Sequence, residues 1–156
     1  MENEQSSTHD RELIITRKLN APVELVWEVW TQPEHIAKWW GPNGFTNTIT
    51  KMDVVSGGAW ELVMHGPDGK DYKNRSIFRE VIPFKKIVYQ HFAPSFLTTI
   101  EFEAQGDETF LRWHMLFESA EEMIRIVKAA NAAEGLKQNV DKMAAYLDGR
   151  KAVRES

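Results

Sequence analysis

Apolar and polar residues alternate along most of the chain between positions 46 and 117, which is the pattern of half-buried β-strands. Short turn signals interrupt the alternation, such as Gly-Gly at 57–58, Gly-Pro-Asp-Gly at 66–69 and Gln-Gly-Asp-Glu at 105–108. The pattern predicts an early strand at 12–19 and six later strands at 46–55, 59–65, 71–81, 86–92, 97–104 and 109–117.

Helical spacing of apolar residues appears on both sides of this strand-rich region. Val23, Val26, Trp27 and Trp30 predict an amphipathic helix over 22–30. A second short helix is predicted to begin after Thr31, taken as its N-cap, and to end at Gly-Pro in positions 41–42.

The last part of the chain is predicted to be helical. Ser119 followed by Glu122 has the form of a capping box, and Asn131 followed by Glu134 repeats it. We therefore expect a break near residues 130–131 and a final helix over 131–148, ended by Asp-Gly at 148–149 and about 27 Å long.

This order of elements predicts an α+β fold in which an antiparallel meander packs on one side against helices. We expect a disordered N-terminal tail at 1–9, a single domain at 10–149 and a C-terminal tail at 150–156. A sheet that curves around one long helix leaves space between the two layers, and such spaces are common ligand sites.

Composition narrows the function classes. The 156 residues include no cysteine, which excludes disulfides, thiol catalysis and cysteine metal sites. The net charge of −4 argues against a nucleic-acid partner. Neither a secretory signal nor an apolar run long enough to enter a membrane is visible, so we expect a cytoplasmic protein. Six Trp, eight Phe and three Tyr make the chain unusually rich in aromatic rings.

Several strings, taken in order, resemble a known family. They are Ala-Pro-Val-Glu-Leu-Val-Trp at 21–27, Trp-Thr-Gln-Pro-Glu at 30–34, Lys-Trp-Trp-Gly-Pro at 38–42, Gly-Gly-Ala-Trp at 57–60, Met-His-Gly-Pro-Asp-Gly at 64–69, Ile-Val-Tyr at 87–89, the strand at 98–102, and Leu136 followed by Met-Ala-Ala-Tyr-Leu at 143–147. Over residues 11–148 the chain resembles the activator-of-heat-shock-protein-90-ATPase-like family, within the START/birch-pollen-allergen (SRPBCC) superfamily.

The resemblance implies a helix-grip fold, in which a curved antiparallel sheet of about seven strands wraps around a long C-terminal helix. In this superfamily hydrophobic small molecules such as lipids, polyketides and flavonoid-like aromatics bind between sheet and helix. We therefore expect a ligand of this kind. The expected lining residues are Trp39, Trp40, Phe45, Trp60, Met64, Tyr72, Asn74, His91, Met115, Leu136, Val140 and Met143.

Two details of this expected lining follow from spacing. Tyr72, Asn74 and Ser76 share one face of their strand, and if Ile87, Tyr89 and His91 face the same way, His91 joins Tyr72 and Asn74 in a polar cluster. Consecutive helical side chains diverge by about 100°, so we expect one of Trp39 and Trp40 to be exposed or to roof the cavity.

Two other functions remain open. A cyclase or hydrolase would use His91 as its base with Glu80 or Glu101 as the carboxylate. A protein-interaction module, by analogy with the co-chaperone that names the family, would expose an apolar patch near Trp40 or Phe96. The same patch could instead form the interface of a homodimer, so both a monomer and a homodimer remain open. No metal-ligand spacing or phosphate-binding loop is present, so we expect neither a metal nor a cofactor.

Overall fold

The computed structural model of the chain describes residues 11–92, 95–130 and 132–155. Its elements are β1 (Glu12–Leu19), α2 (Val23–Thr31), α3 (Pro33–Trp39), β2 (Thr46–Met52), β3 (Ala59–His65), β4 (Asp71–Ile82), β5 (Lys86–Phe92), β6 (Phe96–Gln105), β7 (Glu108–Phe117), α4 (Ala120–Ala130) and α5 (Ala132–Glu155). The predicted α+β class and element order are confirmed.

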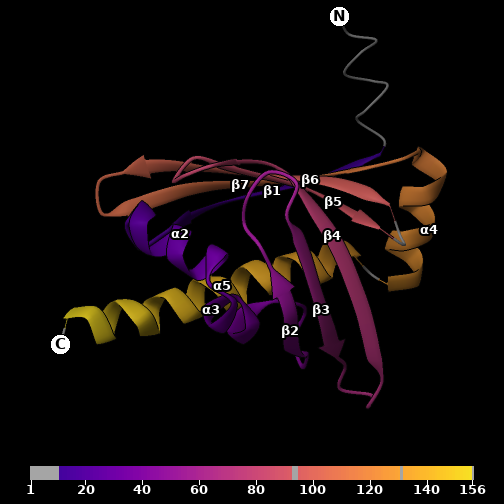
Figure 1. Ribbon diagram of the computed structural model, residues 1–156, viewed down its shortest axis with the longest axis horizontal. Coiled ribbons are helices and arrows are strands. Elements are labelled where there is room, and N and C mark those ends of the chain that lie inside the picture. Colours follow the sequence, from indigo (N-terminus) through magenta and orange to yellow (C-terminus); the bar gives the residue numbers. More distant parts are fainter. Residues whose placement is uncertain (1–10, 93–94, 131, 156) are drawn as a thin grey trace, which may run out of the picture.

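All seven strands form one antiparallel sheet in the order β1-β7-β6-β5-β4-β3-β2. Consecutive strands pair as a meander from β2 to β7, and β1 closes on β7 with Glu12 opposite Leu116. Figure 1 shows the sheet curving over α5, with α2 and α3 on the same side as α5, and α4 at the end of α5 farther from the C-terminus. The fold is therefore the expected helix grip.

Helix α5 is fixed to the loop after α3 by three side chains. Asn139 Nδ2 donates to the Trp39 carbonyl at 2.9 Å, and Lys142 Nζ donates to the Pro42 carbonyl at 3.1 Å. Gln138 Oε1 accepts from the backbone N–H of Asn43 at 3.0 Å. These contacts fix the position of the long helix relative to the end of α3 and the loop that follows it.

Three details of the helices differ from the sequence expectation. Gln32, rather than Thr31, is the N-cap of α3, and Thr31 ends α2, where its hydroxyl donates to the Trp27 carbonyl at 2.7 Å. Pro33 suits the first turn of α3 because its fixed φ matches the helix and its missing N–H would have no partner there. Helix α5 continues through Gly149 to Glu155, because Ala, Lys and Arg beyond the glycine are strong helix formers.

The break between α4 and α5 lies where it was predicted, since α4 ends at Ala130 and α5 begins at Ala132. Ser119 caps α4, and its hydroxyl accepts from the backbone N–H of Glu122 at 3.1 Å. The second predicted cap, Asn131, and the predicted tail at 1–9 lie outside the described residues. No helix in the described part of the chain is long and apolar enough to span a membrane.

Candidate functional site

The inner face of the sheet, which is turned toward α5, carries an aromatic core. Its rings form one connected network: Trp60 stacks on Phe78 at 5.9 Å between centroids and meets Tyr89 edge-on at 5.1 Å. Trp30 on α2 reaches Trp113 on β7 at 5.0 Å. Much of the aromatic excess in the composition is therefore packed between the sheet and the helices.

The two adjacent tryptophans differ in burial: Trp39 belongs to the core, and Trp40 packs against its margin. Trp39 is fully buried against Trp30, with ring centroids 4.9 Å apart. Trp40 is half-buried between Trp60, at 4.9 Å, and Trp113, at 5.6 Å. Trp40 follows the last helical residue and has an extended backbone (φ −68°, ψ 140°), so the helical divergence of about 100° does not apply to this pair.

The predicted polar pair on the inner face is present. His91 on β5 and Asn74 on β4 meet at 2.7 Å between His91 Nε2 and Asn74 Oδ1. Asn74 Nδ2 donates to the Tyr72 carbonyl at 3.2 Å, so Asn74 Oδ1 is the acceptor and His91 Nε2 carries the proton. The sequence left open which face of β5 is turned inward. The burial of Ile87, Tyr89 and His91 shows that these three side chains face inward.

Tyr72 does not join this pair through its hydroxyl. Its hydroxyl donates to Asp68 in the β3–β4 turn at 3.0 Å, and 43% of the residue is exposed. The ring of Tyr72 lies 6.0 Å from that of Phe45. The bond from Tyr72 and the backbone N–H of Lys70 both stabilise ionised Asp68, which lowers the pKa of Asp68 and raises that of Tyr72.

The inner face is not buried evenly. Met64, Tyr72, Asn74, His91 and Phe96 form a continuous strip that we call the inner-face patch: Met64 lies opposite Tyr72, Asn74 bonds to His91, and His91 stacks on Phe96 at 4.5 Å. Three of these side chains are half-buried, Tyr72 is exposed, and His91 is 9% exposed. Inward-facing side chains therefore remain accessible at this end of the sheet.

The other expected lining residues divide into two groups. Trp39, Trp60, Leu136, Val140 and Met143 are buried in the core, and the Met143 sulfur accepts from Trp30 Nε1 at 3.1 Å. Trp40, Phe45 and Met115 are half-buried and thus line the space between the core and solvent.

The outer face of the sheet carries features that the sequence did not reveal. One hollow of about 470 Å³ is lined by Thr50, Glu61, Leu62, Val63, Lys73, Asn74, Arg75 and Phe92. Another of about 510 Å³ is lined by Ile82, Lys85, Lys86, Glu101, Phe102, Glu103, Phe110 and Arg112. Most of the residues that line them are at strand positions that alternate with the buried ones, and neither hollow is lined by α5. Their position could not be read from the sequence because it depends on how far the sheet bends.

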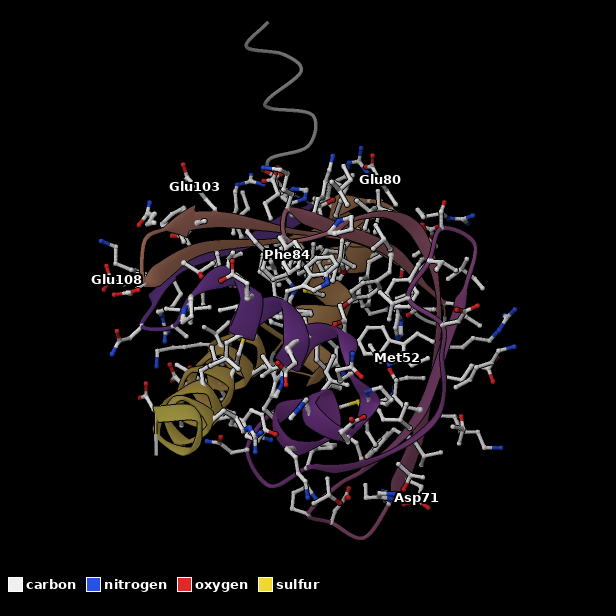
Figure 2. All side chains as sticks on the ribbon, turned by 60° about the vertical axis from the view of Figure 1, so that its left-hand side comes forward. Met52, Asp71, Glu80, Phe84, Glu103 and Glu108 are labelled. Carbon is white, nitrogen blue, oxygen red and sulfur yellow. The ribbon has the colours of Figure 1, made fainter. Side chains whose placement is uncertain are left out.

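The carboxylates considered as partners for a catalytic His91 lie on this outer face. Glu80 pairs with Lys86 at 3.1 Å, and Glu101 pairs with Arg112 at 3.4 Å. Figure 2 shows Glu80 on the side of the sheet away from α5. His91 faces inward, so the sheet separates it from both carboxylates. The arrangement needed for the enzyme alternative is therefore not assembled from these residues.

Other histidines have polar partners of their own. His65 bridges Thr48 and Asp71 on exposed parts of β2 and β4, at 2.8 and 2.7 Å, and His114 meets Glu12 at 2.8 Å. Within the described residues, no group of three or more His, Asp or Glu side chains is placed to hold a metal ion.

Neither of the positions considered for protein interaction, Trp40 and Phe96, is among the most exposed large apolar side chains of the described residues. Those side chains are Ile14, Val55, Tyr72, Ile82, Phe84 and Ile124. Trp40 and Phe96 are each half-buried and packed against other aromatic rings.

Comparison with known structures matches the whole fold. A crystal structure of a protein from Nitrosomonas europaea is similar with a TM-score of 0.81 and 23% identity, covering 92% of this chain and 97% of that one. A solution structure of a protein from Arthrobacter aurescens has a TM-score of 0.85 at 21% identity, covering 90% and 88%. A solution structure of an AHSA1-like protein from Aeromonas hydrophila has a TM-score of 0.71 at 17% identity, covering 89% and 94%.

At these identities the structural matches establish the fold. A search of curated proteins finds no match. The family described as activator of Hsp90 ATPase homolog 1-like protein matches residues 20–148, which include the elements from α2 to β7, α4 and most of α5. The chain therefore belongs to the activator of Hsp90 ATPase homolog 1-like family.

Proposed function

We propose that the protein binds a small hydrophobic or aromatic molecule between the curved sheet and α5, at the inner-face patch. The observation that carries this proposal is the patch itself: Met64, Asn74 and Phe96 face inward yet remain partly accessible. Apolar surface with a few fixed polar groups is the usual chemistry of a small-molecule site.

The surroundings of the patch support an aromatic ligand. Phe96 and His91 already stack face to face, with an interplanar angle of 9°, and Trp40 and Met115 continue the half-buried surface toward the core. Aromatic rings and methionine side chains adapt to flat apolar ligands at low cost. The Asn74–His91 pair supplies orientation, because its hydrogen bond fixes the ring of His91.

Two neighbouring residues of β3 allow a matched test. Met64 faces inward on the patch, whereas Val63 faces outward and lines the 470 Å³ hollow. We would measure binding of the uncharged fluorescent probe N-phenyl-1-naphthylamine to the wild type, Met64→Trp and Val63→Trp. A tryptophan at 64 should fill the patch and weaken binding about tenfold, equivalent to about 1.4 kcal/mol, while a tryptophan at 63 leaves it unchanged.

The opposite result would place the ligand on the outer face. If Val63→Trp weakens binding and Met64→Trp does not, the inner site is wrong and the outer hollow is the binding site. If the wild type gives no saturable response to this probe or to a wider panel of lipids, flavonoids and polyketides, ligand binding itself is refuted. Equal thermal stability of the two variants would serve as the folding control.

A further inference from the structure

The buried inner face holds hydrogen-bond donors that find no acceptor in the protein. Trp60 Nε1 and Trp113 Nε1 are both buried, in residues only 2% exposed, and neither has a partner. The hydroxyl of Thr98, a residue with no exposed surface, has only the phenol of Tyr89 on the neighbouring strand beside it. Native proteins pair nearly all buried polar groups, so unpartnered ones indicate a ligand or an ordered water.

The other buried indoles show that this is not general to the core. Trp30 Nε1 donates to the Met143 sulfur at 3.1 Å, and Trp39 Nε1 donates to the Val29 carbonyl at 3.1 Å. The two buried tryptophans of the helices therefore have acceptors for their indole N–H groups. The two unpartnered indoles are the two that belong to the sheet, and both rings lie against the half-buried Trp40.

Tyr89 and Thr98 connect the two unpartnered indoles across the inner face. Thr98 on β6 is directly opposite Tyr89 on β5, and the Tyr89 ring meets Trp60 at 5.1 Å. On the other side, Trp113 is opposite Ile100, two residues along β6 from Thr98. The groups therefore form an arc across β3, β5, β6 and β7. The arc adjoins the inner-face patch, because Tyr89 is two residues from His91 on the same face.

The chemistry of the arc is neutral. Among the described residues, the buried polar side chains are Ser76, His91, Thr98, Thr109 and Asn139, with no Lys, Arg, Asp or Glu. Burial raises the pKa of the Tyr89 phenol well above its usual value, so this group also stays uncharged. An indole N–H can only donate a hydrogen bond, so its partner must be an acceptor. A charged ligand group would be buried here without an opposite charge, which is energetically costly. The partner that fits is an uncharged acceptor.

From the proposed binding function, on which this step rests, we infer that the ligand carries a neutral carbonyl-type oxygen that accepts a hydrogen bond from the buried indole N–H of Trp60 or Trp113. The ligand class is thereby an uncharged aromatic ketone, quinone, lactone or amide, rather than a hydrocarbon or a carboxylate. Its apolar ring system lies along the inner-face patch, and its oxygen points toward the arc.

Three ligands of nearly equal size test this inference: 1-acetonaphthone, 1-ethylnaphthalene and 1-naphthoate. Equilibrium dialysis would give the affinity of each for the wild type, Trp60→Phe, Trp113→Phe and Trp27→Phe. The Trp27 variant is the matched control, since the Trp27 ring packs on Phe84 and Phe102 away from the arc. The ketone should bind the wild type more tightly than the hydrocarbon by about 2- to 10-fold for each hydrogen bond gained.

Trp60→Phe or Trp113→Phe should remove this preference and keep hydrocarbon binding, which also shows that the variant is folded, whereas Trp27→Phe should retain the preference. Proton NMR of the wild type gives a second measurement that needs no substitution: the ketone, and not the hydrocarbon, should move a buried indole N–H resonance downfield.

Other outcomes would overturn the inference in distinguishable ways. Equal binding of ketone and hydrocarbon means that ordered water satisfies the indoles, and the inference falls while the proposed function stands. Tightest binding of the naphthoate would show that the site is built for an anion. If the preference for the ketone survives in both Trp60→Phe and Trp113→Phe, the ligand oxygen accepts its hydrogen bond from another donor in the protein. If none of the three ligands binds, the proposed function fails and the inference fails with it.

Discussion

The contact between Asn139 and the end of α3 gives a sharp prediction about stability. Asn139 is 6% exposed, and its Nδ2 donates to the Trp39 carbonyl at 2.9 Å across 100 positions of sequence. Asn139→Asp replaces this donor with a carboxylate that faces a carbonyl oxygen in a buried setting. Losing the bond and leaving the carbonyl unpaired costs about 1–3 kcal/mol, and the buried charge adds to that cost.

The charge makes the penalty depend on pH. Burial and the facing carbonyl raise the pKa of an aspartate at 139 above its unfolded value of about 3.9. A raised folded-state pKa means that stability is greatest below the unfolded pKa and falls as pH rises through the folded pKa. Below that range the protonated acid donates to the Trp39 carbonyl and restores the bond. The variant should therefore lie closest to the wild type in acid and farthest from it at pH 7.

Urea denaturation of the wild type, Asn139→Asp and Asn139→Leu at several pH values would measure this. The leucine removes the same donor without adding a charge, and its apolar burial offsets part of the loss, so its difference from the wild type should not change with pH. A difference between the aspartate variant and the wild type that is constant with pH would refute the reasoning.

Three further predictions concern other contacts. Ser119→Ala removes the cap of α4 and should lower the free energy of unfolding by about 1 kcal/mol, measured by urea denaturation; no change would mean that the bond to the Glu122 N–H contributes nothing. Tyr72→Phe should raise the pKa of Asp68 part of the way toward its ordinary value, followed by NMR titration, because the Lys70 N–H still stabilises the ionised carboxylate but the Tyr72 hydroxyl no longer does; an unchanged pKa would mean that the hydroxyl contributes nothing. Trp40→Ala should destabilise the fold by about 3–5 kcal/mol and leave a slot between Trp60 and Trp113, so added indole should raise its melting temperature more than that of the wild type; equal effects would contradict the packing described for Trp40.

The strands could be predicted from the sequence because each has one buried face. Alternation in Lys86–Phe92 and Ala59–His65 places every second residue inward, and both predicted ranges match the structure residue for residue. The same alternation placed Asn74 on the inner face but left the facing of His91 open, because both faces of 86–92 carry apolar residues. It could not show that they bond, because that depends on the register between β4 and β5, which sequence periodicity does not contain.

Where the sequence misled, the cause lay in backbone geometry outside regular elements. Trp40 was treated as helical, but its extended backbone brings its ring against the ring of Trp39 at the margin of the core. The unpartnered indoles were also beyond reach, because Trp60 and Trp113 have the same apolar setting in sequence as any core tryptophan. Whether an N–H finds an acceptor is decided by the packing of the helices beneath the sheet.

The pairing of the first strand with the last has a consequence for how the chain acquires its structure during synthesis. The Arg11 guanidinium donates to the Phe117 carbonyl across 106 positions, and the backbone N–H of Phe117 returns a bond to the Arg11 carbonyl. When β1 leaves the ribosome, its partner has not been made, and at about 5–20 residues per second the wait lasts several seconds. During that time β1 is an unpaired strand edge with apolar side chains, the kind of segment that aggregates or recruits chaperones. The pairing of β1 with β7, which completes the sheet above α5, therefore occurs late in the synthesis of the chain.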